Sequence, residues 1–219
     1  MRKQIFFTLI LAFMATAVLW CQVTDQGNFV IGSTLGFSTA NSKVTQEVGD
    51  AGATNEERPF SVQLNIAPKV GYFLVDNFAL GIGVDYTLNR IEEGGEEKVK
   101  DSDLLFGPFG RYYFPVGDDM AFLIEAGFGF GNATDVVGIA GTRQSITTNI
   151  FAFGVGPGFT IVSSESIGLE ASVKYNYAHS SFDTEIGGVR QKTRTDTNQF
   201  DFSVGVQFYF SRIVRATGG

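Results

Sequence analysis

Residues 200–210 read Phe-Asp-Phe-Ser-Val-Gly-Val-Gln-Phe-Tyr-Phe, with an apolar side chain at every even position. A side-chain period of two predicts a β-strand, because successive side chains of a strand point to opposite faces. The even face is long and aromatic, whereas the odd face is mostly small or polar, with residues such as Ser203 and Gly205. One face is therefore suited to an apolar solvent, and the other leaves room for little bulk.

The same alternation recurs along the whole chain. Seven earlier stretches show it, at about residues 29–39, 60–73, 78–89, 103–114, 121–131, 147–161 and 167–177. Long polar segments alternate with short turns between them; the long ones are residues 41–59, 91–102, 132–145 and 179–197. Eight strands joined in this way predict an all-β fold, a transmembrane antiparallel up-and-down β-barrel with short periplasmic turns and long extracellular loops.

The volume of the side chains decides which face points outward. A soluble barrel of the lipocalin kind would enclose the apolar face and expose the polar one. The interior of an eight-stranded barrel is barely wide enough for its own side chains. The apolar faces here carry five or six large residues per strand and would not fit inside, whereas the Gly-, Ala- and Ser-rich faces would. We therefore expect the apolar face to contact lipid.

The first residues have the features of a secretory signal peptide, with a basic start at Arg2 and Lys3 and an apolar run over residues 5–20. We expect residues 1–21 to be this leader, cleaved after Ala17 or after Cys21, with the barrel over 22–210 and a short periplasmic tail over 211–219. A lipidated Cys21 is the less favoured alternative, since the bulky Trp20 precedes it. The formal net charge of −7 argues against a nucleic-acid partner.

These features resemble the small outer-membrane β-barrel proteins of the OmpA and OmpX type, over about residues 28–210. The terminal strand is similar to the aromatic-ended strand that the barrel assembly machinery recognises, through Phe200, Phe202, Phe208, Tyr209 and Phe210. The resemblance implies the outer membrane as the location, both termini in the periplasm, and a monomer. It also implies contacts with outer-membrane lipid, lipopolysaccharide, periplasmic chaperones and the assembly machinery. Here, unlike in many members, nine residues follow the last aromatic residue.

Isolated charges fall on the lumen faces of the predicted strands. We expect them to form a network that plugs the lumen, made of Lys69, Asp85, Arg111, Glu125, Glu170, Lys174 and Asp201.

Two predicted hairpins set the partners within this network. If Phe114 and Phe122 are opposed across the short turn, Arg111 lies directly against Glu125, close enough for an ion pair. In the next hairpin, a register with Ile161 opposite Ile167 sets Glu170 against Gly158 and Lys174 against Gly154. Lys174 would then reach toward Asp201.

Chemistry has little support in the sequence. The Gly-x-Gly-x-Gly runs at residues 127–131 and 154–158 lie within strand patterns and open no helix, so they predict no nucleotide site. His179, with Ser180, Ser181, Asp183 and Glu185 close behind, resembles the lipid A deacylases. A base, a nucleophile and an orienting acid would have to meet in space, which short polar loop residues do not ensure. We expect no enzyme, no cofactor and no metal.

Three functions remain open at this point. The favoured one is a non-enzymatic, membrane-anchored scaffold whose extracellular loops mediate adhesion or ligand contact and which supports envelope integrity. The first alternative is a narrow porin for small solutes. The second is a lipid A-modifying hydrolase that uses His179 and Ser181. An open or closed lumen discriminates the first two.

Overall fold

The chain folds almost entirely into strands in the computed structural model, which describes residues 22–48, 53–57, 61–91, 99–117, 119–139, 142–163, 166–186 and 189–211. A short 3₁₀ helix, η1 (Gln22–Thr24), comes first. The strands then follow in order as β1 (Phe29–Val48), β2 (Ala53–Glu57), β3 (Ser61–Val75), β4 (Phe78–Ile91), β5 (Val99–Pro115), β6 (Met120–Ile139), β7 (Thr142–Ser163), β8 (Ile167–Ile186) and β9 (Val189–Phe210).

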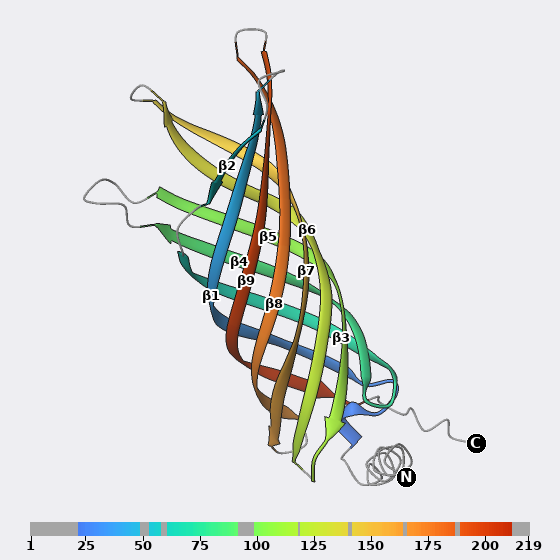
Figure 1. The fold of residues 1–219 in the computed structure, drawn as a ribbon. Coiled ribbons are helices and arrows are strands. Elements are labelled where there is room, and N and C mark those ends of the chain that lie inside the picture. Colours follow the sequence, from blue (N-terminus) through green and yellow to red (C-terminus); the bar gives the residue numbers. More distant parts are fainter. Residues whose placement is uncertain are drawn as a thin grey trace, which may run out of the picture.

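Eight of these strands close into a barrel, as predicted. Each pairs antiparallel with its neighbour in the order β1-β3-β4-β5-β6-β7-β8-β9, and β1 also pairs with β9. The closing pair is in register from Phe29 opposite Phe210 to Val48 opposite Gln191. The strands run obliquely around a long tube (Figure 1). No helix among the described residues is long and apolar enough to cross a membrane.

The strands are longer at one end of the barrel than the sequence indicated. Three predicted loops are largely wrong, because β1 continues to Val48, β6 and β7 meet across residues 140–141, and β8 and β9 meet across residues 187–188. The ninth strand, β2, pairs with β1 inside the predicted loop 41–59. Neighbouring strands satisfy each other's backbone hydrogen bonds, so these segments need no apolar face to stay extended. Figure 1 shows β8 and β9 rising well beyond β3.

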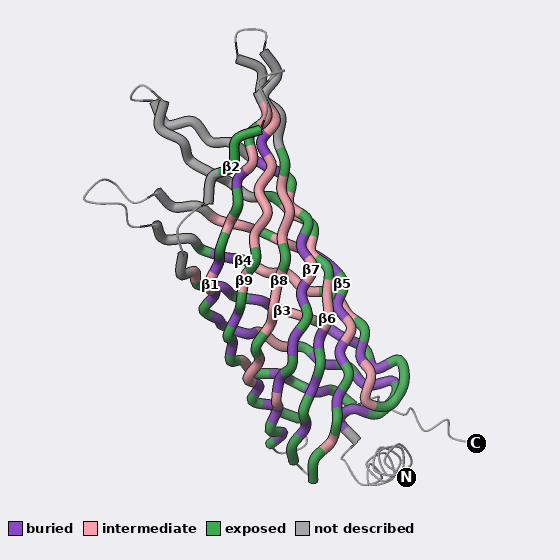
Figure 2. The backbone as a smooth tube through the Cα atoms, in the orientation of Figure 1, coloured by how far each residue is buried: buried purple, intermediate pink, exposed green. Residues whose placement is uncertain are grey.

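The apolar face of every barrel strand points outward, as predicted. Along β9, Phe200, Phe202 and Val204 are each more than half exposed, whereas Asp201 and Ser203 between them are buried. Figure 2 shows the same alternation of buried and exposed residues on the other strands. Glycine lines the inner side where strands approach closely; a Cβ on Gly107 would collide with the carbonyl oxygen of Phe128. Small inner residues therefore allow the tube to be narrow.

Three prolines interrupt the barrel ladder. Pro68, Pro108 and Pro157 lie in β3, β5 and β7, and all three face outward. Pairing with the following strand lapses at each of them, and resumes one or two residues later in the same register. A proline has no N–H to donate to a ladder, which explains each gap. The remaining pairs hold the closed sheet together around these points.

Candidate functional site: the occluded lumen and the outer rim

Arg111 is the centre of a charge cluster inside the barrel. The structure has the predicted register, with Arg111 opposite Glu125 and Phe114 opposite Phe122. The guanidinium donates to Glu125 Oε2 from Nε at 3.0 Å and from Nη2 at 2.5 Å. It also donates to both oxygens of Glu170, at 2.7 Å and 3.1 Å, and to the Tyr113 hydroxyl at 3.1 Å. Such forked pairs fix orientation as well as charge, and these side chains are almost fully buried.

Two lysines approach the same carboxylate from the other side. Lys69 and Lys174 both donate to Glu125 Oε1, and the Lys174 bond is 3.1 Å long. Glu125 therefore receives hydrogen bonds from three cations, and all its lone-pair directions face donors. The cluster joins β3, β5, β6 and β8 across the lumen, so it braces strands that are not neighbours in the sheet.

The remaining two lumen acids lie outside this cluster. Asp85 accepts a hydrogen bond from Thr87 at 3.2 Å. Asp201 accepts from Asn176 and, at 2.6 Å, from Gln199. The structure thus brings five of the seven predicted residues into one ion-pair cluster and leaves two in hydrogen bonds to neutral groups.

The predicted partners in the β7–β8 hairpin were wrong. Ile161 lies opposite Leu169, not Ile167, so the register differs by two residues. Glu170 consequently faces Thr160, and the residue opposite Gly154 is Asn176. Lys174 is directly opposed to Asp201, but its ammonium group binds Glu125. The alternation of the strands survives a two-residue shift, because side chains keep their faces, and so periodicity could not detect the error.

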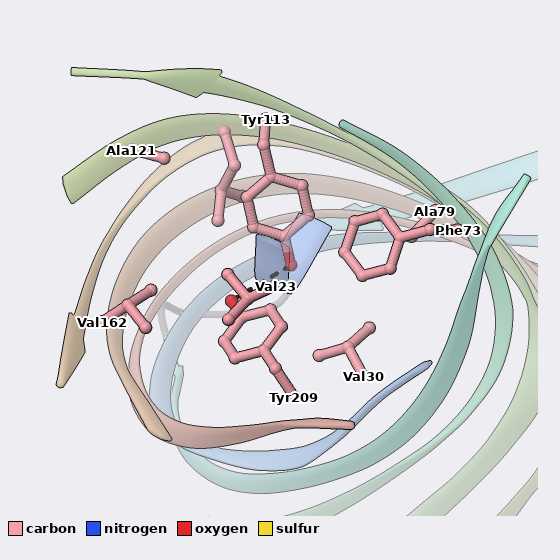
Figure 3. Packing of buried hydrophobic residues seen from close by; sticks show 9 residues of the cluster. Val23, Val30, Phe73, Ala79, Tyr113, Ala121, Val162 and Tyr209 are labelled. Carbon is pink, nitrogen blue, oxygen red and sulfur yellow. Dashed lines mark hydrogen bonds between the residues drawn. The ribbon is translucent and has the colours of Figure 1, made fainter. Parts of the chain in front are cut away.

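An apolar cluster closes the periplasmic end of the lumen. Val23 of η1 is buried among Phe73, Tyr113 and Tyr209 inside the ring of strands (Figure 3). The Tyr209 and Tyr113 hydroxyls are 3.5 Å apart, and the two rings meet edge to face. Tyr209 therefore points inward, although we had grouped it with the outward phenylalanines of the terminal strand.

Polar contacts hold the segment around η1 in this mouth. The backbone N–H of Asn77 donates to the Thr24 carbonyl at 2.9 Å, and the Thr24 hydroxyl donates to the Asn77 side chain at 2.7 Å. Asn77 lies in the β3–β4 turn with φ of 64°, a conformation that asparagine tolerates better than most residues. Phe73 exchanges backbone hydrogen bonds with Gly27 and Asn28. The segment is thus tied to the barrel wall by its own backbone.

Sequence reasoning gave this closure no role, although a signal for it exists. Phe73, Tyr113 and Tyr209 are large aromatic residues on lumen faces that are otherwise small, and each falls near the periplasmic end of its strand. Bulk that is out of phase with the strand pattern marks a place where the interior is filled. The position of Val23 had no comparable signal.

A small cavity of about 80 Å³ lies in the lumen beside the charge cluster. Its polar lining comes from Lys69, Asp85, Glu125, Lys174 and Asn176. A water molecule occupies about 30 Å³ in the liquid, so the space suits a few waters and no larger solute. Within the described part of the chain, no three His, Cys, Asp or Glu side chains gather as a metal site.

On the outside of the barrel, His179 meets an acid that the sequence did not indicate. His179 lies directly opposite Asp196 of β9, and its Nδ1 is 2.8 Å from Asp196 Oδ1. The side chains of Asp183 and Glu185, the acids suggested by proximity in sequence, lie outside the described residues. Asp196 lies within the segment predicted as a loop, so its approach to His179 depends on strand pairing. Ser181 lies two residues from His179, on the same outward face.

The fold and this architecture agree with known protein families. The family described as outer membrane protein beta-barrel domain matches residues 6–210. The chain belongs to this family. Its members are outer-membrane barrels, which places the protein in the outer membrane.

Solved structures agree on the barrel fold. OprG from Pseudomonas aeruginosa is 16% identical with a TM-score of 0.58, over 88% of this chain and 100% of that chain. Neisserial surface protein A is 16% identical with a TM-score of 0.44, over 80% and 96% of the two chains. The outer-membrane protease OmpT from Escherichia coli is 8% identical with a TM-score of 0.43, over 84% and 97%. No curated protein matches the chain.

Proposed function

We propose that the protein is a membrane-anchored scaffold whose extracellular strands contact ligands or neighbouring surfaces and whose lumen passes no solutes. The observation that carries the proposal is the double closure of the lumen. The cluster around Val23 fills the periplasmic mouth, and the ion pairs around Arg111 cross the tube above it. A solute would have to displace both layers.

The extended strands support the contact role. β1, β8 and β9 continue as paired strands for several residues beyond the last outward aromatic positions, such as Phe37 and Phe200. Their outward side chains there are polar and charged, as in the ion pair between Arg194 and Glu47 at 3.0 Å. A stiff polar rim is a better contact surface than a mobile loop, because less entropy is lost when it binds.

The saturated ion pairs favour a structural role for the lumen charges over catalysis. Arg111 and Glu125 spend their hydrogen-bonding capacity on each other and on Glu170, Lys69 and Lys174. We further propose that both termini lie in the periplasm and that the protein is a monomer. Its proposed partners are lipopolysaccharide and other outer-membrane lipids, with periplasmic chaperones and the barrel assembly machinery acting during insertion.

Conductance in a planar lipid bilayer tests the closed lumen against the narrow pore. The purified barrel should give little or no steady current, whereas a known porin inserted in the same way gives steps. A barrel without residues 22–26 should conduct little more than the wild type, because the Arg111 cluster still blocks the tube. A large and stable wild-type conductance would refute the proposal and make the pore the better assignment.

A further inference from the structure

The His179–Asp196 pair on the outer face has the geometry of an oriented general base. Asp196 accepts from His179 Nδ1 at 2.8 Å and from the Tyr177 hydroxyl at 2.6 Å. These two hydrogen bonds, the one from Tyr177 first, lower the pKa of Asp196. An ionised carboxylate accepts only, so the proton sits on Nδ1 and the second ring nitrogen, Nε2, is left to accept one.

A hydroxyl nucleophile lies next to this base. Ser181 follows His179 by two residues on the same outward face of β8, about 6.8 Å along the strand. Its side chain is exposed and, among the described residues, makes no hydrogen bond. Rotation of the two side chains toward each other brings Oγ into reach of Nε2, and such bonds commonly tighten only when a substrate is bound.

Donors flank the hydroxyl on both neighbouring strands. Asn149 of β7 and Arg194 of β9 are the direct cross-strand partners of Ser181. Directly opposed side chains have Cβ atoms about 4.5–5.5 Å apart. An amide N–H or a guanidinium at that distance is placed to stabilise negative charge that develops on an oxygen bound near Ser181.

The cluster lies at the level where lipid hydrocarbon gives way to headgroups. Phe151 is the direct neighbour of His179 on β7, and Phe200 is opposite Tyr175 two pairs below the Asp196 position. These rings face outward, and aromatic residues mark the membrane interface. One row above His179 the outward residues are all polar, at Asn149, Ser181 and Arg194. Acyl esters of lipids lie at this boundary, between the chains and the headgroup.

We infer that Ser181, His179 and Asp196 form a serine-esterase triad that cleaves a carboxylic ester of an outer-leaflet lipid. Ser181 and His179 are the catalytic residues, and Asp196 is a positioning residue that acts through His179. This activity goes beyond the scaffold function and does not depend on it, since the lumen plays no part. It corrects the expectation that the protein is not an enzyme.

The reaction balances with water as the second reactant. Ser181 Oγ attacks the ester carbonyl carbon, and its proton passes to His179 Nε2. The carbon–oxygen bond to the alcohol breaks, and the leaving alkoxide takes that proton from His179. Water then attacks the acyl-serine, gives a proton to His179, and the fatty acid leaves as Ser181 regains its proton. Phe151 provides apolar contact for the acyl chain below.

The test uses the full barrel in vesicles, with two lipid compositions. One contains phospholipid alone and the other contains lipopolysaccharide, and mass spectrometry measures the fatty acid released and the deacylated lipid. We expect wild-type protein to release fatty acid at least tenfold faster than Ser181→Ala in one of the two, and this identifies the lipid. An alkyl fluorophosphonate should label Ser181 with loss of fluoride.

Matched variants separate catalysis from structure. Ser180→Ala changes the adjacent serine, which faces the other side of the strand, and should keep wild-type hydrolysis and labelling. Asp196→Asn should lower kcat at least tenfold with little change in KM, and Asp196→Glu should restore part of it. Heat-modifiable gel mobility verifies that each barrel is folded. Equal hydrolysis by Ser181→Ala, or no hydrolysis and no labelling by folded wild type with either lipid, would overturn the inference.

Discussion

Replacement of Glu125 by Gln should destabilise the barrel more than any other single change to a lumen charge. Glu125 is 3% exposed and accepts two hydrogen bonds from Arg111 and one each from Lys69 and Lys174. Glutamine keeps the volume of the side chain but removes its charge. Three cations would then share Glu170 as the only carboxylate of the cluster.

The size of the effect follows from burial. One ion pair at 4 Å is worth about 4 kcal/mol at an effective dielectric constant of 20, and desolvation offsets part of this gain. Loss of one partner of a buried pair typically costs ~3–5 kcal/mol, because the remaining charge stays buried without compensation. We expect a loss in this range for Glu125→Gln in the free energy of unfolding.

Asp85 provides the matched control. It is a lumen carboxylate as well, but its printed contact is a single hydrogen bond from Thr87, so Asp85→Asn should cost only about 0.5–1.5 kcal/mol. Urea unfolding in lipid vesicles, followed by gel mobility, measures both. The double variant Glu125→Gln with Arg111→Met should lose less than the sum of the two single variants. If Asp85→Asn destabilises the barrel as much as Glu125→Gln, the reasoning about the cluster is wrong.

Other predictions test the facing, the mouth and the topology. Val204→Arg places a charge on the lipid face of β9, at a cost of ~2–4 kcal/mol near the midplane, and should slow folding into vesicles far more than Asn198→Arg near the rim. Equal effects would contradict the lipid-facing assignment. Val23→Asp should lower the unfolding midpoint, because it buries a charge among aromatic rings; an unchanged midpoint would mean that η1 leaves the mouth easily. On intact cells, a membrane-impermeant maleimide should label Lys192→Cys but not Ser211→Cys, and the reverse pattern would invert the orientation.

The barrel could be predicted from the sequence because its cause is local. A strand in lipid needs an apolar side chain at every second position, and a narrow lumen needs small ones between, so residues 200–210 carry both constraints in one line of text. The Arg111–Glu125 pair was also within reach, since a short turn with aromatic residues on both sides sets the register of its hairpin.

The polar segments above the membrane could not be assigned in this way. Residues 179–197 have no apolar period, yet they are paired strands because the neighbouring strands supply their backbone partners. The two-residue register error at Ile161 has a similar origin, since a shift by two keeps every face.

The contacts across the lumen and around its rim depended on the closed fold alone. Lys69, Glu125 and Glu170 are far apart in sequence, and only the closure of β1 on β9 brings β3, β6 and β8 around one narrow space. Asp196 reaches His179 for the same reason, through the pairing of β8 with β9. Alternation determines the face on which a side chain lies, whereas its partners on that face are set by register, strand tilt and barrel closure, which are properties of the whole sheet.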